Sequence, residues 1–167
     1  AFPILGLTQL LINFNQDNMT GISMSLSEFK PDKSDGYRSE LDALYLCHNF
    51  YSKKRKFKAN FFFFIKGKED LRNYDELKIL TFYVDNVIYG FATIDNDRNE
   101  KEVQIFMMPK KCFKGYGLIL LLNLEKYIYI NYNQVREIYA QCNDLSENTF
   151  ITAGYDDDIG NLYKRIR

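Results

Sequence analysis

Two glycines separated by one residue, Gly115 and Gly117, stand between a strand-like run and an apolar run. Residues 102–108 favour a strand, and Pro109 ends it because proline has no N–H to give to a neighbouring strand. The apolar segment 118–130 that follows is expected to be a helix. Three lysines lie near the glycines: Lys110, Lys111 and Lys114. Backbone N–H groups at a helix start, beside positive charge, favour binding of phosphate or pyrophosphate.

Two common phosphate-binding motifs do not fit this stretch. A P-loop requires the string G-x-x-x-x-G-K-[ST], which the sequence lacks. A dinucleotide fingerprint requires a third glycine three residues after the second, and Leu120 occupies that position. A strand-to-helix turn whose glycines serve only tight geometry stays an alternative.

The stretch from Pro109 to Gly117 resembles the acetyl-CoA loop of the GNAT superfamily of N-acetyltransferases, whose motif is [QR]-x-x-G-x-[GA]. Gly115 and Gly117 match this motif, while Cys112 stands where Gln or Arg is usual. A second family motif, N-x-x-[AS]-x-x-x-Y-x-x-x-G-F, is matched at five positions: Asn143, Ser146, Phe150, Gly154 and Tyr155. Phe150 replaces the usual Tyr, and Tyr155 replaces the usual Phe.

The resemblance implies an α/β (α+β) fold with a mixed, mostly antiparallel central sheet flanked by helices. The fourth and fifth strands, here about 102–108 and 136–141, would splay apart and admit the pantetheine arm of acetyl-CoA. The implied cofactor-binding residues, which act mostly through their backbone, are Phe106, Met107, Met108, Cys112, Phe113, Lys114, Gly115, Tyr116, Gly117, Asn143, Ser146 and Phe150.

The implied reaction is direct transfer of an acetyl group from acetyl-CoA to a primary amine. The family's usual acid is the Tyr at the position of Phe150, and Phe cannot donate a proton. The nearest phenols in the sequence, Tyr155 and Tyr163, are candidate acids, with water as an alternative. Glu102, the only carboxylate on the expected fourth strand, is the candidate base. A module that binds acyl-CoA without catalysis, or an unrelated interaction domain, would also be consistent with the sequence.

The remaining elements follow from periodicity and turn residues. A hairpin is expected from strands 77–84 and 87–94 around Asp85 and Asn86, with Gly90 marking a bulge or a close backbone approach. The other expected elements are a strand at 22–27, a helix at 37–51, a strand at 136–141, a helix at 147–153 and a last strand at 161–166. Residues 61–65 fit either a strand or a helix. The aspartates 156–158 could attract a cationic amine, but three aspartates after a helix are more often a solvated turn.

The length and composition of the chain set the expectations about its domains, its partners and its location. At 167 residues the chain is most simply one domain, at 21–167, preceded by a helical extension at 1–20 that could contact a second copy. The net charge of zero argues against nucleic acid as a partner, and no run is apolar enough to span a membrane. Three cysteines without paired spacing and one histidine, His48, predict a cytoplasmic protein without a metal site. We expect a monomer or a homodimer, with His48 at the surface or the core edge.

Overall fold

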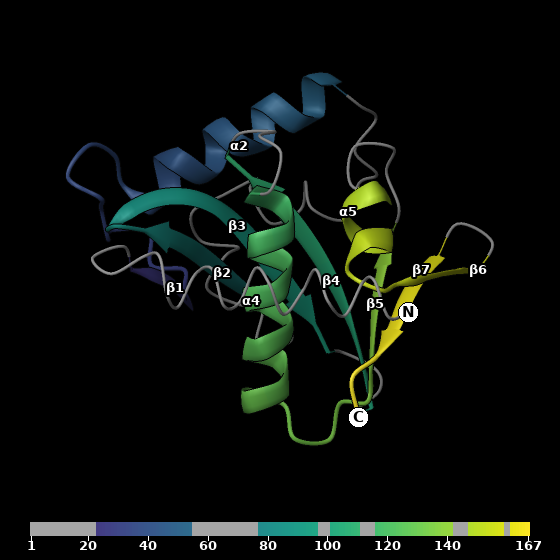
Figure 1. Cartoon of the computed structure of the whole chain (residues 1–167). Coiled ribbons are helices and arrows are strands. Elements are labelled where there is room, and N and C mark those ends of the chain that lie inside the picture. Colours follow the sequence, from purple (N-terminus) through teal and green to yellow (C-terminus); the bar gives the residue numbers. More distant parts are fainter. Residues whose placement is uncertain (1–22, 55–76, 97–100, 111–115, 142–146, 159–160) are drawn as a thin grey trace.

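The computed structural model describes residues 23–54, 77–96, 101–110, 116–141, 147–158 and 161–167. The expected extension at 1–20 and the ambiguous run at 61–65 lie outside these ranges. The described elements, in order, are β1 Met24–Glu28, α2 Glu40–Lys54, β2 Leu77–Val84, β3 Val87–Asp95, β4 Glu102–Pro109, α4 Tyr116–Asn131, β5 Glu137–Gln141, α5 Glu147–Thr152, β6 Asp156–Asp158 and β7 Asn161–Arg165 (Figure 1).

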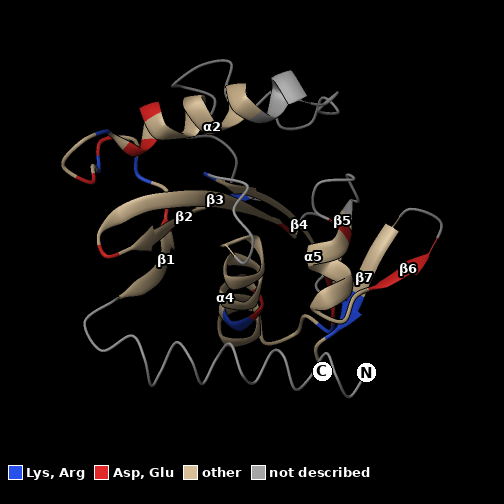
Figure 2. Ribbon diagram, turned by 45° about the horizontal axis from the view of Figure 1, so that its top comes forward, with Lys and Arg blue, Asp and Glu red and all other residues tan. Residues whose placement is uncertain are grey.

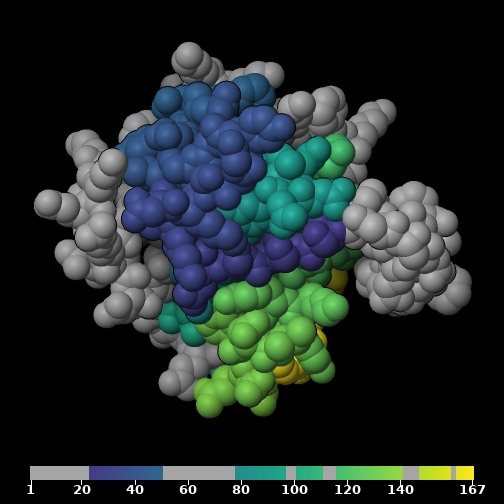
Figure 3. Space-filling model, turned by 90° about the vertical axis from the view of Figure 1, so that its left-hand side faces the viewer, coloured from purple at the N-terminus to yellow at the C-terminus, as the bar shows by residue number. Residues whose placement is uncertain are grey.

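Within the described ranges the strands form a seven-stranded sheet in the order β1-β2-β3-β4-β5-β7-β6. Every neighbouring pair is antiparallel except β4 and β5, which run parallel. Figure 3 looks toward the edge of the sheet formed by β1, with the blue atoms of α2 on one side and the green atoms of α4 on the other. The expected mixed, mostly antiparallel sheet between helices is confirmed.

The two faces of the sheet carry separate hydrophobic cores. The larger core lies between the sheet and α4 and includes Leu80, Ile94, Val103, Ile105, Leu120, Leu124, Ile138, Phe150, Tyr155 and Leu162. The smaller core lies under α2 and consists of Ala43, Leu44, Cys47, Tyr83, Ile88, Phe91 and Met108. Successive strand residues alternate between the two cores, as the pleat of a strand requires.

The predicted β2–β3 hairpin is confirmed. Asp85 and Asn86 take positive φ values of 51° and 63°, which Asp and Asn tolerate better than most residues. Phe82 lies opposite Gly90 while Tyr83 lies opposite Ile88, so Tyr89 is the extra residue of a β-bulge. A Cβ atom on Gly90 would lie 2.7 Å from the carbonyl oxygen of Met108, so the predicted close backbone approach is also confirmed.

Helix α2 begins at Glu40, three residues later than the sequence predicted, because the chain before it makes its own turn. The Asp35 carboxylate accepts hydrogen bonds from the backbone N–H groups of Tyr37 (2.9 Å) and Arg38 (2.8 Å). The Ser39 hydroxyl oxygen then accepts from the Asp42 N–H at 3.2 Å and caps the helix. Side-chain bonds of this kind compete locally with helix formation.

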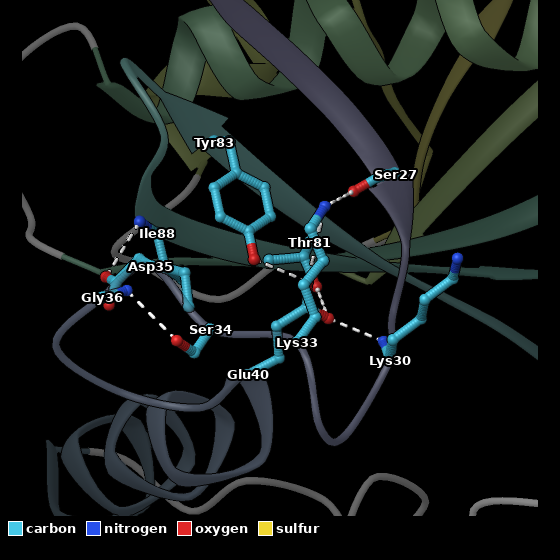
Figure 4. Close-up of polar contacts among 10 residues, drawn as sticks. All are labelled: Ser27, Lys30, Lys33, Ser34, Asp35, Gly36, Glu40, Thr81, Tyr83 and Ile88. Carbon is cyan, nitrogen blue, oxygen red and sulfur yellow. Dashed lines mark hydrogen bonds and ion pairs between the residues drawn. The ribbon is translucent and has the colours of Figure 1, made fainter.

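A buried carboxylate ties this loop to the sheet. Glu40 is completely buried and accepts three hydrogen bonds: from the Tyr83 hydroxyl (2.7 Å), the Thr81 hydroxyl (2.9 Å) and the backbone N–H of Lys30 (2.6 Å). Figure 4 shows these three donors converging on the carboxylate from β2 and from the loop. The Lys33 ammonium lies 4.0 Å from the same carboxylate and is partly exposed. Glu40 therefore joins β2, the loop and the start of α2.

Two predictions were wrong. Residues Asp156–Asp158 are exposed, as expected, but they form the edge strand β6, which pairs with β7, rather than a turn (Figure 2, red). Pairing with a strand that follows in the sequence outweighs the low strand propensity of Asp. His48 was expected at the surface or core edge, and it is buried on α2 at 3% exposure.

Candidate cofactor site

Strands β4 and β5 part after four paired residues. Their parallel pairing runs from Glu102 opposite Glu137 to Ile105 opposite Ala140. β4 continues beyond that pair to Pro109, where it still pairs with β3. The predicted splay between the fourth and fifth strands is therefore present, and it opens at residues 106–108, the stretch expected to contact pantetheine.

Successive side chains at the splay point to opposite sides of the sheet. Met108 is buried in the core under α2, and Phe106 packs against the same core. Met107 packs on the opposite side, against the core under α4. A ligand arm that entered the splay would therefore run beside a backbone held rigidly by packing on both faces.

The start of α4 lies against the end of β4 and against α5. A Cβ atom on Gly117 would lie 3.6 Å from the Thr149 hydroxyl oxygen and 3.9 Å from Cγ of Pro109, which are ordinary contact distances. The first turn of α4 holds no acidic residue, so the partial positive charge of the helix start is not neutralised there. Residues 111–115 between β4 and α4, with the site candidates Cys112, Phe113, Lys114 and Gly115, lie outside the described ranges.

Tyr89, which sequence reasoning missed, joins the two ends of this loop. Its ring stacks on that of Tyr116, the first residue of α4, with centroids 5.2 Å apart and planes at 22°. Its carbonyl oxygen accepts a hydrogen bond from the Lys110 N–H at 2.7 Å. The only sequence signal was Gly90, which indicated the bulge that turns Tyr89 toward α4.

Helix α5 presents an apolar side chain where the resemblance expects a phenol. Phe150 is buried at 3% exposure, and its ring meets the Tyr155 ring edge to face at 5.0 Å. Gly154, at φ 94°, ends this helical segment as the sequence predicted. The other residues of the motif, Asn143 and Ser146, lie outside the described part of the chain.

Tyr155 lies in the core on the α4 side of the sheet. It is 3% exposed, and its hydroxyl has no hydrogen-bond partner among the described residues. Burial, and then the negative charge of Glu125, raises the pKa of Tyr155 well above its ordinary value. The phenol therefore keeps its proton, and it lies on the face of the sheet opposite to Phe106 and Met108.

The other two catalytic candidates lie on the opposite face, on β7 and β4 with β5 between them. Tyr163 on β7 is opposite Tyr139 on β5, and their rings stack at 6.1 Å. Glu102 begins β4 at the closed end of the splay and is exposed. Four residues along a strand separate Glu102 from Phe106, a distance of roughly 13 Å at the usual rise per residue.

The described cysteine and histidine offer no further chemistry. Burial raises the pKa of the Cys47 thiol to about 11, although Lys110 and Arg38 oppose the shift, so the reactive thiolate is scarce at neutral pH. Burial also lowers the pKa of His48. Within the ranges described above, no three His, Cys, Asp or Glu residues form a group that could hold a metal ion. None of the helices in those ranges is long and apolar enough to cross a membrane.

Comparison with known proteins shows which solved structures share this fold. No family model and no curated protein matches the sequence. The solved structures that resemble it include the N-acetyltransferase PseH of Campylobacter jejuni in complex with acetyl coenzyme A, at 17% identity and a TM-score of 0.59 over 87% of this chain and 99% of that one. The aminoglycoside acetyltransferase AAC(6')-Ib in complex with coenzyme A is 12% identical, with a TM-score of 0.63 over 86% and 95%. A GNAT-family acetyltransferase of Streptococcus pneumoniae is 14% identical, with a TM-score of 0.58 over 87% and 100%. The chain therefore has the fold of the GNAT acetyltransferases.

Proposed function

We propose that the chain is an N-acetyltransferase that moves an acetyl group from acetyl-CoA directly to a primary amine. The observation that carries this proposal is the parting of β4 and β5 after the Ile105–Ala140 pair, next to the start of α4. A splay of this kind offers an extended arm a strand to lie along, and a helix start offers N–H groups to a pyrophosphate. Two of the structural neighbours hold acetyl-CoA or CoA, which supports the same ligand here.

The proposed binding mode uses mainly backbone groups. Residues 106–108 would contact the pantetheine arm, and residues 112–117 would hold the pyrophosphate. Asn143 would hydrogen-bond the pantetheine amides, with Ser146 and Phe150 beside it. Because these contacts depend on backbone, the replacement of the usual Gln or Arg by Cys112 changes the motif more than the chemistry.

The proposed reaction is one nucleophilic displacement. The neutral amine attacks the thioester carbonyl carbon, the new C–N bond forms, and the C–S bond breaks. A backbone N–H near Met107 or Met108 stabilises the oxyanion. The amine loses a proton to water, or to Glu102 through a chain of waters because Glu102 is roughly 13 Å along β4 from Phe106, and the thiolate gains one. Because Phe150 cannot donate and Tyr155 is buried in the core, we assign the second proton to water. Tyr163, the other candidate acid, lies on the side of the sheet away from α4, stacked on Tyr139.

A second function is favoured by one observation. Phe150 packs in the core at the position where the family usually holds its acid, which is consistent with a module that binds acyl-CoA without transferring its acyl group. The two functions differ in thiol release: only an enzyme produces free CoA faster in the presence of an amine.

Thermal unfolding with excess acetyl-CoA, and with AMP as a control, tests the proposal. A ligand at one hundred times its dissociation constant adds about 2.7 kcal/mol to the free energy of unfolding. For a domain of this size the expected rise in Tm is on the order of 5–10 °C. Thiol release with a panel of primary amines then separates the enzyme from the binding module. No shift at saturating acetyl-CoA would refute both.

Gly117→Val tests the loop itself. We expect this variant to lose the acetyl-CoA shift while its own Tm changes little, because the added methyl groups obstruct the backbone approach at the helix start. Gly117→Ala is the matched control, since the space around Cβ is ordinary and the motif accepts Ala. Unchanged acetyl-CoA affinity in Gly117→Val would remove this assignment.

A further inference from the structure

The C-terminal half of the sheet has one buried face and one open face. On the α4 side of β4, β5 and β7, the apolar side chains are buried: Val103, Ile105, Ile138, Ala140 and Leu162. On the opposite side, the end of β4 is covered, because Phe106 and Met108 belong to or pack against the core under α2. Away from that end, the residues whose side chains are described are exposed or half-buried: Glu102, Gln104, Glu137, Tyr139, Asn161, Tyr163 and Arg165. Asp156 and Asp158 of β6 extend this open face by their register with β7.

Two tyrosines occupy the centre of the open face. The register places Gln104, Tyr139, Tyr163 and Asp156 in one row across four strands. The two rings stack at 6.1 Å with planes at 30°. The Tyr139 hydroxyl donates to the Glu137 carboxylate at 2.7 Å, which fixes the ring beside a negative charge.

The charge of this face is strongly negative, although the whole chain is neutral. Among the described side chains of β4 to β7, four carboxylates lie on this face around the rings, those of Glu102, Glu137, Asp156 and Asp158, against one guanidinium, that of Arg165. Aromatic faces and carboxylates both attract organic cations. Aspartates on an edge strand also discourage pairing with another chain, but that role does not require two stacked tyrosines beside Glu137.

The open face is continuous with the splay. Glu102 and Gln104 precede Phe106 and Met108 on the same side of β4, because alternate residues of a strand share a face. A molecule seated on Tyr139 and Tyr163 would therefore lie next to the point where β4 and β5 part. This position suits the acceptor of the reaction proposed above.

We propose that this surface binds the acceptor, and that the acceptor is a small amine that carries a second positive charge. The proposal rests on the proposed acetyl transfer. The reacting nitrogen must be neutral when it attacks the thioester carbon, so a surface that attracted only that nitrogen as an ammonium would oppose the reaction. A second ammonium is not consumed: it stays on the carboxylates and rings while the first nitrogen forms the amide, and the thiolate leaves with a proton from water.

Three compounds with the same four-carbon chain test this proposal: putrescine, butylamine and γ-aminobutyrate, whose second ends are positive, neutral and negative. Calorimetry measures their binding to the protein with and without CoA, and thiol release measures their turnover with acetyl-CoA. We expect putrescine to bind at least tenfold more tightly than butylamine, and γ-aminobutyrate to bind most weakly. The preference for putrescine should shrink as salt rises.

Paired variants locate the effect. Asp156→Asn and Glu137→Gln should each reduce the ratio of putrescine to butylamine affinity about threefold, and Tyr163→Leu should reduce it similarly. Asp157→Asn is the matched control, because Asp157 is on the same strand and carries the same charge but faces the other side of the sheet. Equal effects of the Asp156 and Asp157 substitutions would overturn the assignment to this face.

The outcomes separate this inference from the proposed function. A thermal shift with acetyl-CoA, together with equal binding of putrescine and butylamine, overturns the acceptor class and leaves acetyl-CoA binding intact. A preference for putrescine without any acetyl-CoA shift overturns the role of the surface as an acceptor site. A shift with acetyl-CoA, a preference for putrescine and its loss in Asp156→Asn would support both.

Discussion

Replacing Glu40 should destabilise the protein more than any single surface change, because its carboxylate is the common acceptor of three donors, two on β2 and one in the loop before α2. Glu40→Ala leaves the hydroxyls of Thr81 and Tyr83 and the N–H of Lys30 without their acceptor. Each lost hydrogen bond to a buried charged group costs about 1.5–3 kcal/mol, and the losses are not additive. Water that enters the vacated space satisfies part of the demand. We therefore expect the free energy of unfolding to fall by about 3–5 kcal/mol.

Urea denaturation followed by far-ultraviolet circular dichroism measures this change, since the chain has no tryptophan. Asp42→Ala, in the first turn of α2 and exposed, is the control and should change stability by less than about 1 kcal/mol, the usual size of a charge effect at a helix start. Thr81→Val in the Glu40→Ala background should cost less than Thr81→Val alone, because the two residues share one bond. A loss below about 1 kcal/mol for Glu40→Ala would refute the reasoning, since it would mean that water replaces the carboxylate without cost.

Three further predictions concern Gly90, Lys164 and Cys47. Gly90→Ala places a methyl group 2.7 Å from the Met108 carbonyl oxygen, so it should lower stability by about 1–3 kcal/mol in urea denaturation; an unchanged midpoint would contradict the close approach. Lys164→Met removes the ammonium that lies 2.9 Å from Glu125. Burial raises the pKa of Glu125, and Lys164 opposes that rise. Without Lys164 the pKa of Glu125 in the folded protein should rise further above its unfolded value. Folding then favours the protonated carboxyl, so the folded protein loses stability as pH rises and Glu125 must ionise. The variant should therefore be destabilised by about 3 kcal/mol at pH 8 and by less at pH 5, and equal losses at the two pH values would contradict this. Cys47, with its pKa raised to about 11, should resist iodoacetamide at pH 8 in peptide mass spectrometry until denaturant is added; labelling of the folded protein would show that the thiol is accessible.

Local sequence signals predicted the elements that depend on local chemistry. Asp85 and Asn86 tolerate positive φ, so they specified the hairpin, and Gly90 marked the bulge beside it. The apolar run at 118–130 specified α4, which is slightly longer in the structure and spans Tyr116–Asn131. In both cases the residue types favoured one local conformation, so no distant contact was needed to select it. The splay between β4 and β5 was expected only because the two glycine-containing motifs resemble those of the GNAT superfamily.

Local sequence signals did not predict features that depend on contacts between residues far apart in the sequence. The Asp156–Asp158 run becomes a strand only because β7 pairs with it, and no local propensity of Asp predicts that. The importance of Glu40 depends on Thr81 and Tyr83, which follow it by 41 and 43 residues. The open face around Tyr139 and Tyr163 depends on which side of the sheet the helices cover, and that was visible only once the register was known.

The exchange of aromatic residues at 150 and 155 shows why a motif and its chemistry can separate. Packing needs an aromatic ring at each position, and both rings are in the core, edge to face at 5.0 Å. Proton donation needs more, because a hydroxyl must also reach the splay. The phenol of Tyr155 is in the core beside Glu125 and Lys164, so moving the hydroxyl from position 150 to position 155 keeps the packing and removes the donor. A thiolate is a good leaving group, and water can protonate it. If the chain transfers acetyl groups as proposed, the loss of that donor would therefore lower the rate without removing the binding geometry on which the transfer depends.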